Sequence, residues 1–192
     1  MGDFVEQWIT SIADVDPQDW DQCVNGSGDS DPFNHRSSYI SGRPFIEHSF
    51  LLGLEKTGCV GGDTGWTPQH LTLYRDHELV AVSPCYIKLN SEGEFIFDWS
   101  WADAAYRAGL PYYPKRLVAS PFSPVHGPRL LCKQGLSPQE KRAAQCALIE
   151  ALGGLDHGPI ATGSHCLFIS EEESLLFAEA GWAIRDLSLI HI

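Results

Sequence analysis

The segment from Gly93 to Leu131 places the strongest constraint on what this 192-residue chain can fold into. It begins with an alternating run at 94–97 that predicts a strand, followed by aromatic and alanine residues at helical spacing from Trp99 until Gly109. The apolar run within 115–120 predicts a buried strand. Proline and glycine residues then restrict the backbone of the next loop: Pro121, Pro124, Gly127 and Pro128. The segment therefore predicts a strand that ends in an exposed, rigid loop beside an aromatic helix.

The sequence before this segment alternates between strand and helix signals. A strand pattern at 4–12 is followed by a helix that begins at Pro17, and a second helix begins at Pro44. Two alternating apolar runs, 70–75 and 79–88, flank a turn and predict a β-hairpin.

The sequence after the segment repeats this alternation. Ser137 and Glu140 occupy the two positions of a capping box, which predicts a helix that ends at Gly153-Gly154. A strand, a helix and a strand are predicted next, at 165–169, 171–180 and 182–187. This order predicts a mixed α/β domain with a central sheet flanked by helices.

Composition excludes several classes of function. The formal net charge of −12 argues against a DNA-binding surface, because phosphate contacts need clustered Lys and Arg. The start of the chain lacks the features of a signal peptide, and no run is apolar enough for a membrane span, so we expect a cytoplasmic protein. The six cysteines form no CxxC pair and the histidines show no metal-ligand spacing, so we expect reduced thiols and no metal site.

Two segments resemble signature segments of a known family. FDWSWADAAYRAG (97–109) and YYPKRLVASPFSPVHGPRLL (112–131) are similar to those of the FemAB-like family of peptidoglycan biosynthesis or recognition proteins. FAEAGWAIRD (177–186) is similar to the ending of the GNAT acyltransferase fold, and PFIEHSFLLGLEKTG (44–58) also fits. The resemblance implies a GNAT-like fold, with a mixed central sheet flanked by helices, and a cytoplasmic N-acyltransferase built from two such halves.

The resemblance also implies a division of the chain. Residues 1–186 would be the N-terminal GNAT-like domain, and the second GNAT-like half would be missing. The last six residues, LSLIHI (187–192), are similar to a translated sequencing adapter, so we expect a non-native or truncated tail. A native terminal strand is the alternative for these residues.

Asp98 and Asp103 are the candidate catalytic residues. In the acyl transfer that the resemblance implies, an amine attacks a thioester and the enzyme accepts the amine proton. Asp98 lies beside Trp99, and we expect an apolar neighbourhood there to raise the pKa of its carboxyl. The alternative is that Asp98 caps the helix that begins at Trp99, and both roles can coexist.

The remaining site candidates are substrate-binding residues. The aromatic candidates are Trp99, Trp101, Tyr106, Tyr112 and Tyr113. They are suited to lining an acceptor cleft, although aromatic residues at helical spacing more often belong to a core. In an extended strand the two adjacent tyrosines would point to opposite sides. The phosphate-binding candidates are His126, Gly127 and Arg129, with a surface cation as the alternative for Arg129.

Two functions fit these observations. The first is an N-acyltransferase that acts on a peptidoglycan-related precursor or another amine, with acyl-CoA or aminoacyl-tRNA as the donor and with little activity in this fragment alone. The phosphate loop lacks the Q/RxxGxG/A pattern, which argues against acyl-CoA binding by this half. The second is a non-catalytic domain that recognises a glycan or peptide. The expected partner in both cases is a small-molecule, peptide or glycan precursor.

Overall fold

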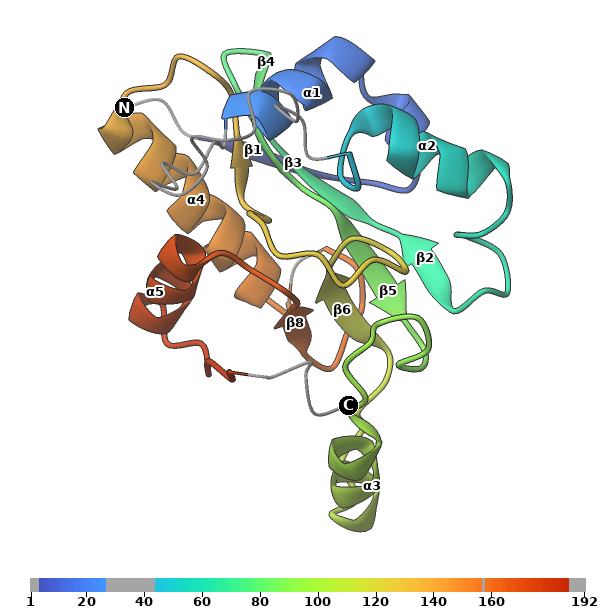
Figure 1. Ribbon diagram of the computed structural model, residues 1–192. Coiled ribbons are helices and arrows are strands. Elements are labelled where there is room, and N and C mark those ends of the chain that lie inside the picture. The colour runs from blue at the N-terminus through green and yellow to red at the C-terminus, as the bar shows by residue number, and fades with distance from the viewer. Residues whose placement is uncertain (1–3, 27–43, 157, 187–192) are drawn as a thin grey trace.

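The structure, a computed structural model, describes residues 4–26, 44–156 and 158–186 (Figure 1). The strands are β1 (Val5–Ile9), β2 (Trp66–Pro68), β3 (His70–Arg75), β4 (Glu78–Ser83), β5 (Cys85–Lys88), β6 (Lys115–Val118), β7 (Leu131–Cys132) and β8 (Ser164–Cys166). The helices are α1 (Pro17–Gly26), α2 (His48–Lys56), α3 (Trp99–Arg107), α4 (Pro138–Gly153) and α5 (Glu171–Glu179), with a 3₁₀ turn at Ile12–Asp14. The mixed α/β class predicted from the sequence is confirmed.

One long hairpin joins two sheets, whose strand orders are β1-β3-β4-β7 and β2-β5-β6-β8. Its first arm is β2 and β3, interrupted at Gln69, and its second arm is β4 and β5, interrupted at Pro84. At this junction the Gln69 N–H donates to the Cys85 carbonyl at 2.9 Å, and the Cys85 N–H donates to Nδ1 of buried His70 at 3.2 Å. The imidazole therefore completes the hydrogen bonding where proline, which lacks an N–H, interrupts the strand.

The second arm of the hairpin is flanked by β6 and β7, which are consecutive in the chain. β6 pairs antiparallel with β5, and β7 pairs antiparallel with β4. Between them, residues 119–130 leave the sheet and return to it. β8 pairs parallel with β6 from Arg116 to Val118, and its described pairing involves β6 alone. The sheet therefore divides at the carboxyl end of β6.

Helices cover both faces of the first sheet (Figure 1). On one face, Leu148 and Leu152 of α4 and Phe177 of α5 pack against Leu71 and Leu73. On the other face, α1 and α2 contribute the side chains that contact Val82 and Leu131: Trp20, Val24 and Leu51. The core of this part of the molecule is therefore a sheet between two helical layers.

The two ends of α4 are satisfied by polar side chains. Ser137 and Glu140 form the predicted capping box at its N-terminus. At the other end, the buried Arg116 guanidinium of β6 donates to the carbonyls of Ala151 and Leu152, at 3.2 and 2.9 Å. A cation at the carboxyl end of a helix is favoured by the helix dipole.

Two predicted strands do not form. At 94–97 the backbone turns, because Gly93 and Phe95 have φ angles of 76° and 62°, which a strand cannot accommodate. Residues 182–186 lie outside both sheets, since Trp182 folds back onto Phe177 with a ring separation of 4.9 Å. The second helix begins at His48 instead of Pro44.

The capping box offers a direct test of the fold at α4. We expect Ser137→Ala to lower the free energy of unfolding by about 1 kcal/mol, because it removes the side-chain acceptor for the Glu140 N–H. Urea denaturation of the two proteins measures the difference. Gln139→Ala, on an exposed position of the same turn, should change the value by less than about 0.5 kcal/mol. Equal effects of the two substitutions would contradict the prediction.

Candidate functional site at the base of an aromatic arm

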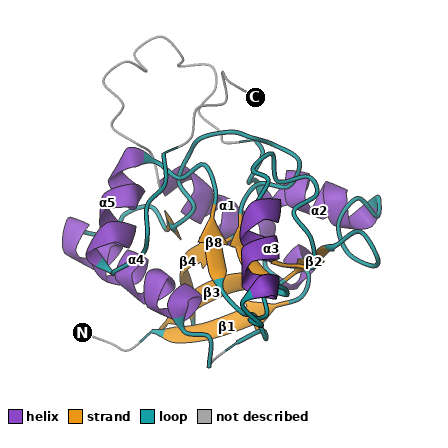
Figure 2. Cartoon of the chain, turned by 90° about the horizontal axis from the view of Figure 1, so that it is seen from below, coloured by secondary structure: helices purple, strands orange, loops and turns teal. Residues whose placement is uncertain are grey.

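Helix α3 projects from the body of the molecule in Figure 1, and in Figure 2, seen from below, it lies in front of the strands. None of its residues is buried. We call residues 95–110 the aromatic arm, because its large apolar side chains are exposed to solvent: Phe95, Phe97, Trp99, Trp101, Tyr106 and Leu110. Trp99 is 63% exposed and Tyr106 is 83% exposed, so these aromatic residues do not belong to a core.

Two contacts organise the aromatic arm. The rings of Phe97 and Trp99 lie 4.7 Å apart at an angle of 30°, so they form one offset aromatic surface. The Arg185 guanidinium lies 5.2 Å from the Trp101 ring. The arm therefore presents aromatic side chains to solvent, with a cation–π contact to the residues that follow α5.

A buried group of polar side chains lies at the base of the arm. We call it the anchor cluster: Glu94, Asp98, Tyr112, Tyr113 and Lys115. The Lys115 ammonium donates to Glu94 at 2.8 Å and also to Asp98. The hydroxyls of Tyr112 and Tyr113 donate to the two oxygens of Asp98, at 2.8 and 3.0 Å. The Asp98 carboxylate thus accepts hydrogen bonds from three side chains.

Burial distinguishes this cluster from an ordinary surface ion pair. The side chain of Lys115 is 1% exposed, that of Glu94 is 2% exposed and that of Asp98 is 8% exposed. Ionised groups this deeply buried need partners, because losing water costs several kcal/mol per ion. Here the partners come from the residues before helix α3, from the residues after it and from strand β6.

The pKa of Asp98 moves in the direction opposite to the prediction. Burial alone would raise this pKa, but the hydrogen bonds from Lys115, Tyr112 and Tyr113 outweigh burial and lower it. Asp98 also precedes α3 at the N-cap position without making a side-chain cap bond. Its carboxylate is used by the anchor cluster instead of by the helix.

The other titratable groups of this region respond mainly to burial. Burial raises the pKa of Glu94, with Lys115 opposing the shift, and burial together with the bond to Asp98 raises the pKa of Tyr112. Burial lowers the pKa of Lys88 to about 8; its ammonium lies 3.9 Å from the centre of the Trp66 ring. Burial also lowers the pKa of His165, whose ring lies 5.9 Å from that of Tyr112.

The structure joins Asp98, Tyr112 and Tyr113 but separates them from other predicted site residues. The expectation that adjacent tyrosines point to opposite sides is wrong, because residues 110–114 do not form a strand. Asp103 lies on the exposed surface of α3 and pairs with Arg107 at 2.6 Å. The three phosphate-binding candidates, His126, Gly127 and Arg129, follow the opposite end of β6 from Lys115.

Arg129 is turned inward, so it is neither a surface cation nor placed to bind a ligand phosphate. It is 1% exposed, and its guanidinium donates to the carbonyls of Val125, Gly127 and Pro128, at 2.6, 3.2 and 3.1 Å. The Gly127 N–H donates to the Phe168 carbonyl at 3.0 Å. These bonds tie the loop 119–130 to itself and to the chain that follows β8.

A buried carboxylate closes this loop onto α5. Glu173 accepts the Arg129 N–H at 2.8 Å and the Leu130 N–H at 2.6 Å. Burial raises the pKa of Glu173 to about 7, although these N–H bonds favour its ionised form. The loop thus lies where the sheet divides, a place at which open α/β sheets commonly receive ligands.

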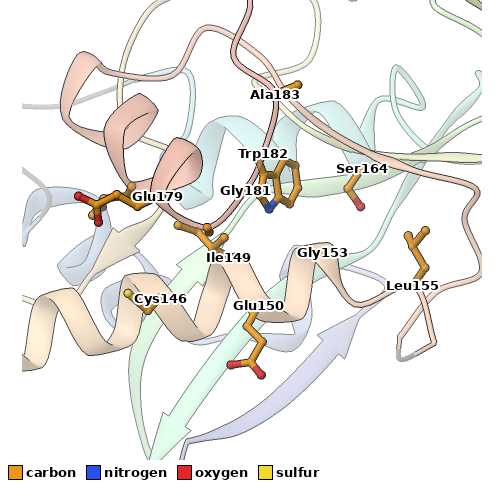
Figure 3. Close-up of a pocket in the computed structure, with 12 residues that line it drawn as sticks. Cys146, Ile149, Glu150, Gly153, Leu155, Ser164, Glu179, Gly181, Trp182 and Ala183 are labelled. Carbon is orange, nitrogen blue, oxygen red and sulfur yellow. The ribbon is translucent and has the colours of Figure 1, made fainter.

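A separate groove of about 820 Å³ lies between α4 and α5 (Figure 3). Trp182 lies near its centre, and Ile149 and Gly153 of α4 form part of its wall. The side chains of Glu150 and Glu179 stand at its edge. None of these residues was predicted from the sequence to belong to a site, because apolar and acidic residues are common in helices and in the segments that connect them.

A family model for proteins of peptidoglycan biosynthesis or recognition matches residues 11–191, which is most of the chain. The chain belongs to the FemAB-like family. No curated protein and no solved structure matches it. The family match extends to residue 191 and gives no support to the expectation that the chain is only an N-terminal half. The assignment of 187–192 as a non-native tail stays a prediction, and those residues lie outside the described structure.

The described part of this FemAB-like chain has neither a metal-binding cluster nor a membrane-spanning helix. It contains no group of three or more His, Cys, Asp or Glu side chains placed to hold a metal ion. It contains no helix that is both long and apolar enough to cross a membrane. Cys59 and Cys146 are exposed to solvent as free thiols.

The central cation of the FemAB-like anchor cluster was not among the residues predicted for the site. Lys115 lies at the start of the predicted buried strand 115–120, beside Arg116. A signal was present, because a lysine at the start of a predicted buried strand requires a buried partner. Glu94 was missed because it was assigned to a strand that does not form.

The pKa of Glu173 gives a testable pH dependence. Between the ordinary value of 4.5 and about 7, native Glu173 holds a proton that the unfolded chain has lost, so its contribution to stability falls as the pH rises through this window. We therefore expect the free energy of unfolding of the wild type, relative to Glu173→Gln, to decrease from about pH 5 to about pH 7.

Chemical denaturation at several pH values measures this difference. Glu172→Gln, at an exposed position beside Glu173, serves as the matched control and should follow the wild type. A difference between wild type and Glu173→Gln that is constant or rises with pH would contradict the assignment.

Proposed function

We propose that this FemAB-like chain recognises a peptidoglycan-related glycan or peptide through the aromatic arm. The observation that carries the proposal is the exposure of six large apolar side chains on one short projecting segment. Exposed apolar groups gathered in this way mark binding surfaces, and tryptophan and tyrosine contribute strongly to binding. Family membership supplies the class of ligand.

The chemistry of the arm suits an uncharged ring or a peptide backbone. The neighbouring rings of Phe97 and Trp99, tilted by 30° to each other, offer an exposed aromatic face on which the C–H face of a sugar ring can pack. The charges of Asp103 and Arg107 on the same helix pair with each other. The net charge of −12 argues against tRNA as a partner of this surface.

The second candidate function is N-acyl transfer to an amine of the same ligand. It is favoured by the anchor cluster, which places a carboxylate, an ammonium and two phenols within hydrogen-bonding distance beside the proposed acceptor surface. Two observations weigh against it. The lowered pKa of Asp98 makes its carboxylate a weak base, and loop 119–130 occupies the division of the sheet where a donor would be expected.

Recognition is tested with a soluble disaccharide-pentapeptide titrated against the protein by calorimetry. We expect Trp99→Ala to weaken binding about tenfold, or about 1.4 kcal/mol, because it removes half of the stacked surface. Leu175→Ala removes an exposed apolar side chain from α5 and should leave the affinity unchanged. Absence of binding to the wild type, or equal effects of both substitutions, would contradict recognition by the arm.

Acyl transfer is tested by offering acyl-CoA and aminoacyl-tRNA separately as donors, with the same disaccharide-pentapeptide as acceptor. If Asp98 is the base, Asp98→Asn should lower the rate at least about 100-fold while the acceptor still binds. An unchanged rate removes Asp98 from the mechanism. No product with either donor leaves recognition as the function and excludes transfer with these donors.

A further inference from the structure

Both flanks of helix α3 meet at one carboxylate. Asp98 precedes α3, and Tyr112 and Tyr113 follow the arm, yet both tyrosine hydroxyls donate to Asp98. Since α3 buries none of its residues, packing of the helix against the body does not fix its direction. The polar contacts at its base have to do so.

Lys115 connects this junction to the sheet. It is the first residue of β6, its backbone pairs with Lys88 of β5, and its ammonium reaches both Glu94 and Asp98. On the far flank, Thr162 donates to the Tyr112 carbonyl at 2.6 Å. The arm is therefore tied to strand β6 through Lys115 on one side and to the segment before β8 through Thr162 on the other.

Stability alone gives little reason for a buried cluster of this kind. Buried ion pairs can often be replaced by apolar side chains of similar volume without loss of stability, because desolvation offsets much of the attraction between the charges. Such a cluster instead fixes the orientation of the segments that carry its side chains, because ammonium and carboxylate groups bond only in restricted geometries.

We propose that Lys115 and Asp98 are positioning residues, which set the direction of the aromatic arm and thereby its affinity for ligand without touching the ligand. This inference rests on the proposed function of the arm. Without the anchor cluster, α3 takes up many directions, and its internal hydrogen bonds also open more often, because a nine-residue helix is marginal in water without tertiary support. The apparent affinity then falls in proportion to the fraction of molecules whose arm is correctly placed.

A cation–π contact between Arg185 and Trp101 also joins the arm's helix to the body. A contact of this kind at an exposed site contributes about 0.5–1 kcal/mol, which is too little to hold a nine-residue helix in one direction. The anchor cluster is thus the main determinant of arm direction.

Asp98→Ala is the informative variant, because it removes the shared carboxylate while Lys115 keeps its bond to Glu94. We expect amide hydrogen exchange over residues 98–113 to become at least about tenfold faster, with exchange in β3 and β4 unchanged. We expect affinity for the disaccharide-pentapeptide to fall about tenfold. Asp98→Asn retains one acceptor oxygen, so this variant should keep most of the wild-type protection from exchange and most of the wild-type affinity.

Tyr113→Phe and Tyr74→Phe form a matched pair of hydroxyl deletions, since Tyr74 lies in β3, away from the arm. The first should speed exchange in the arm and the second should not. If Asp98→Ala loses global protection, Tyr113→Phe alone provides the test.

The outcomes separate this inference from the proposed function. If amide exchange over 98–113 is unchanged in Asp98→Ala and Tyr113→Phe, the anchor cluster does not set the direction of the arm, whatever the measured affinity for ligand. Faster exchange with unchanged affinity would overturn the positioning role. If the wild type binds no disaccharide-pentapeptide, the proposed function fails, and with it the predicted effect on affinity. The exchange data still decide whether the anchor cluster sets the direction of the arm.

Discussion

The projecting aromatic arm of this molecule depends on the ion pair between Lys115 and the carboxylates of Glu94 and Asp98. This ion pair brings a strand residue together with partners 21 and 17 residues earlier in the chain, and so closes the segment that contains the aromatic arm. A side chain that is 1% exposed and charged has to be satisfied completely. The two tyrosines donate to Asp98 in turn, and helix α3, which lies between Asp98 and Tyr112 in the chain, faces solvent.

The same solution recurs at the other polar positions of the interior. Arg116 is turned toward the carbonyls at the carboxyl end of α4, Arg129 toward carbonyls of its own loop, and Glu173 toward the backbone N–H groups of that loop. In each case a charged side chain satisfies backbone groups that have no partner in a regular helix or sheet. Buried charge in this protein is therefore concentrated where regular secondary structure ends.

These constraints place loop 119–130 and the aromatic arm at opposite ends of β6 in this FemAB-like chain. The division of the sheet after β6 is filled by loop 119–130, which Arg129 and Glu173 hold in place. The aromatic arm lies beyond the opposite end of β6, where Lys115 begins the strand. The aromatic arm is exposed to solvent, whereas loop 119–130 closes the division of the sheet. This arrangement favours recognition of a ligand over binding of an acyl donor. The family assignment agrees with that reading, because it covers recognition as well as biosynthesis.

The sequence by itself determined the elements whose signals are local. The capping box at Ser137, the hairpin through 70–88 and the buried strand at Lys115 depend on residues within a turn or a few positions of one another. The sequence also placed Asp98, Tyr112 and Tyr113 among the site residues. Tertiary structure decided what they do: the aromatic residues of α3 face solvent, Arg129 is internal, and Asp98 bonds to Lys115 in place of capping its helix. The physical reason is that a buried charge is stable only beside its partner, and partners 17 to 44 residues apart leave no local pattern.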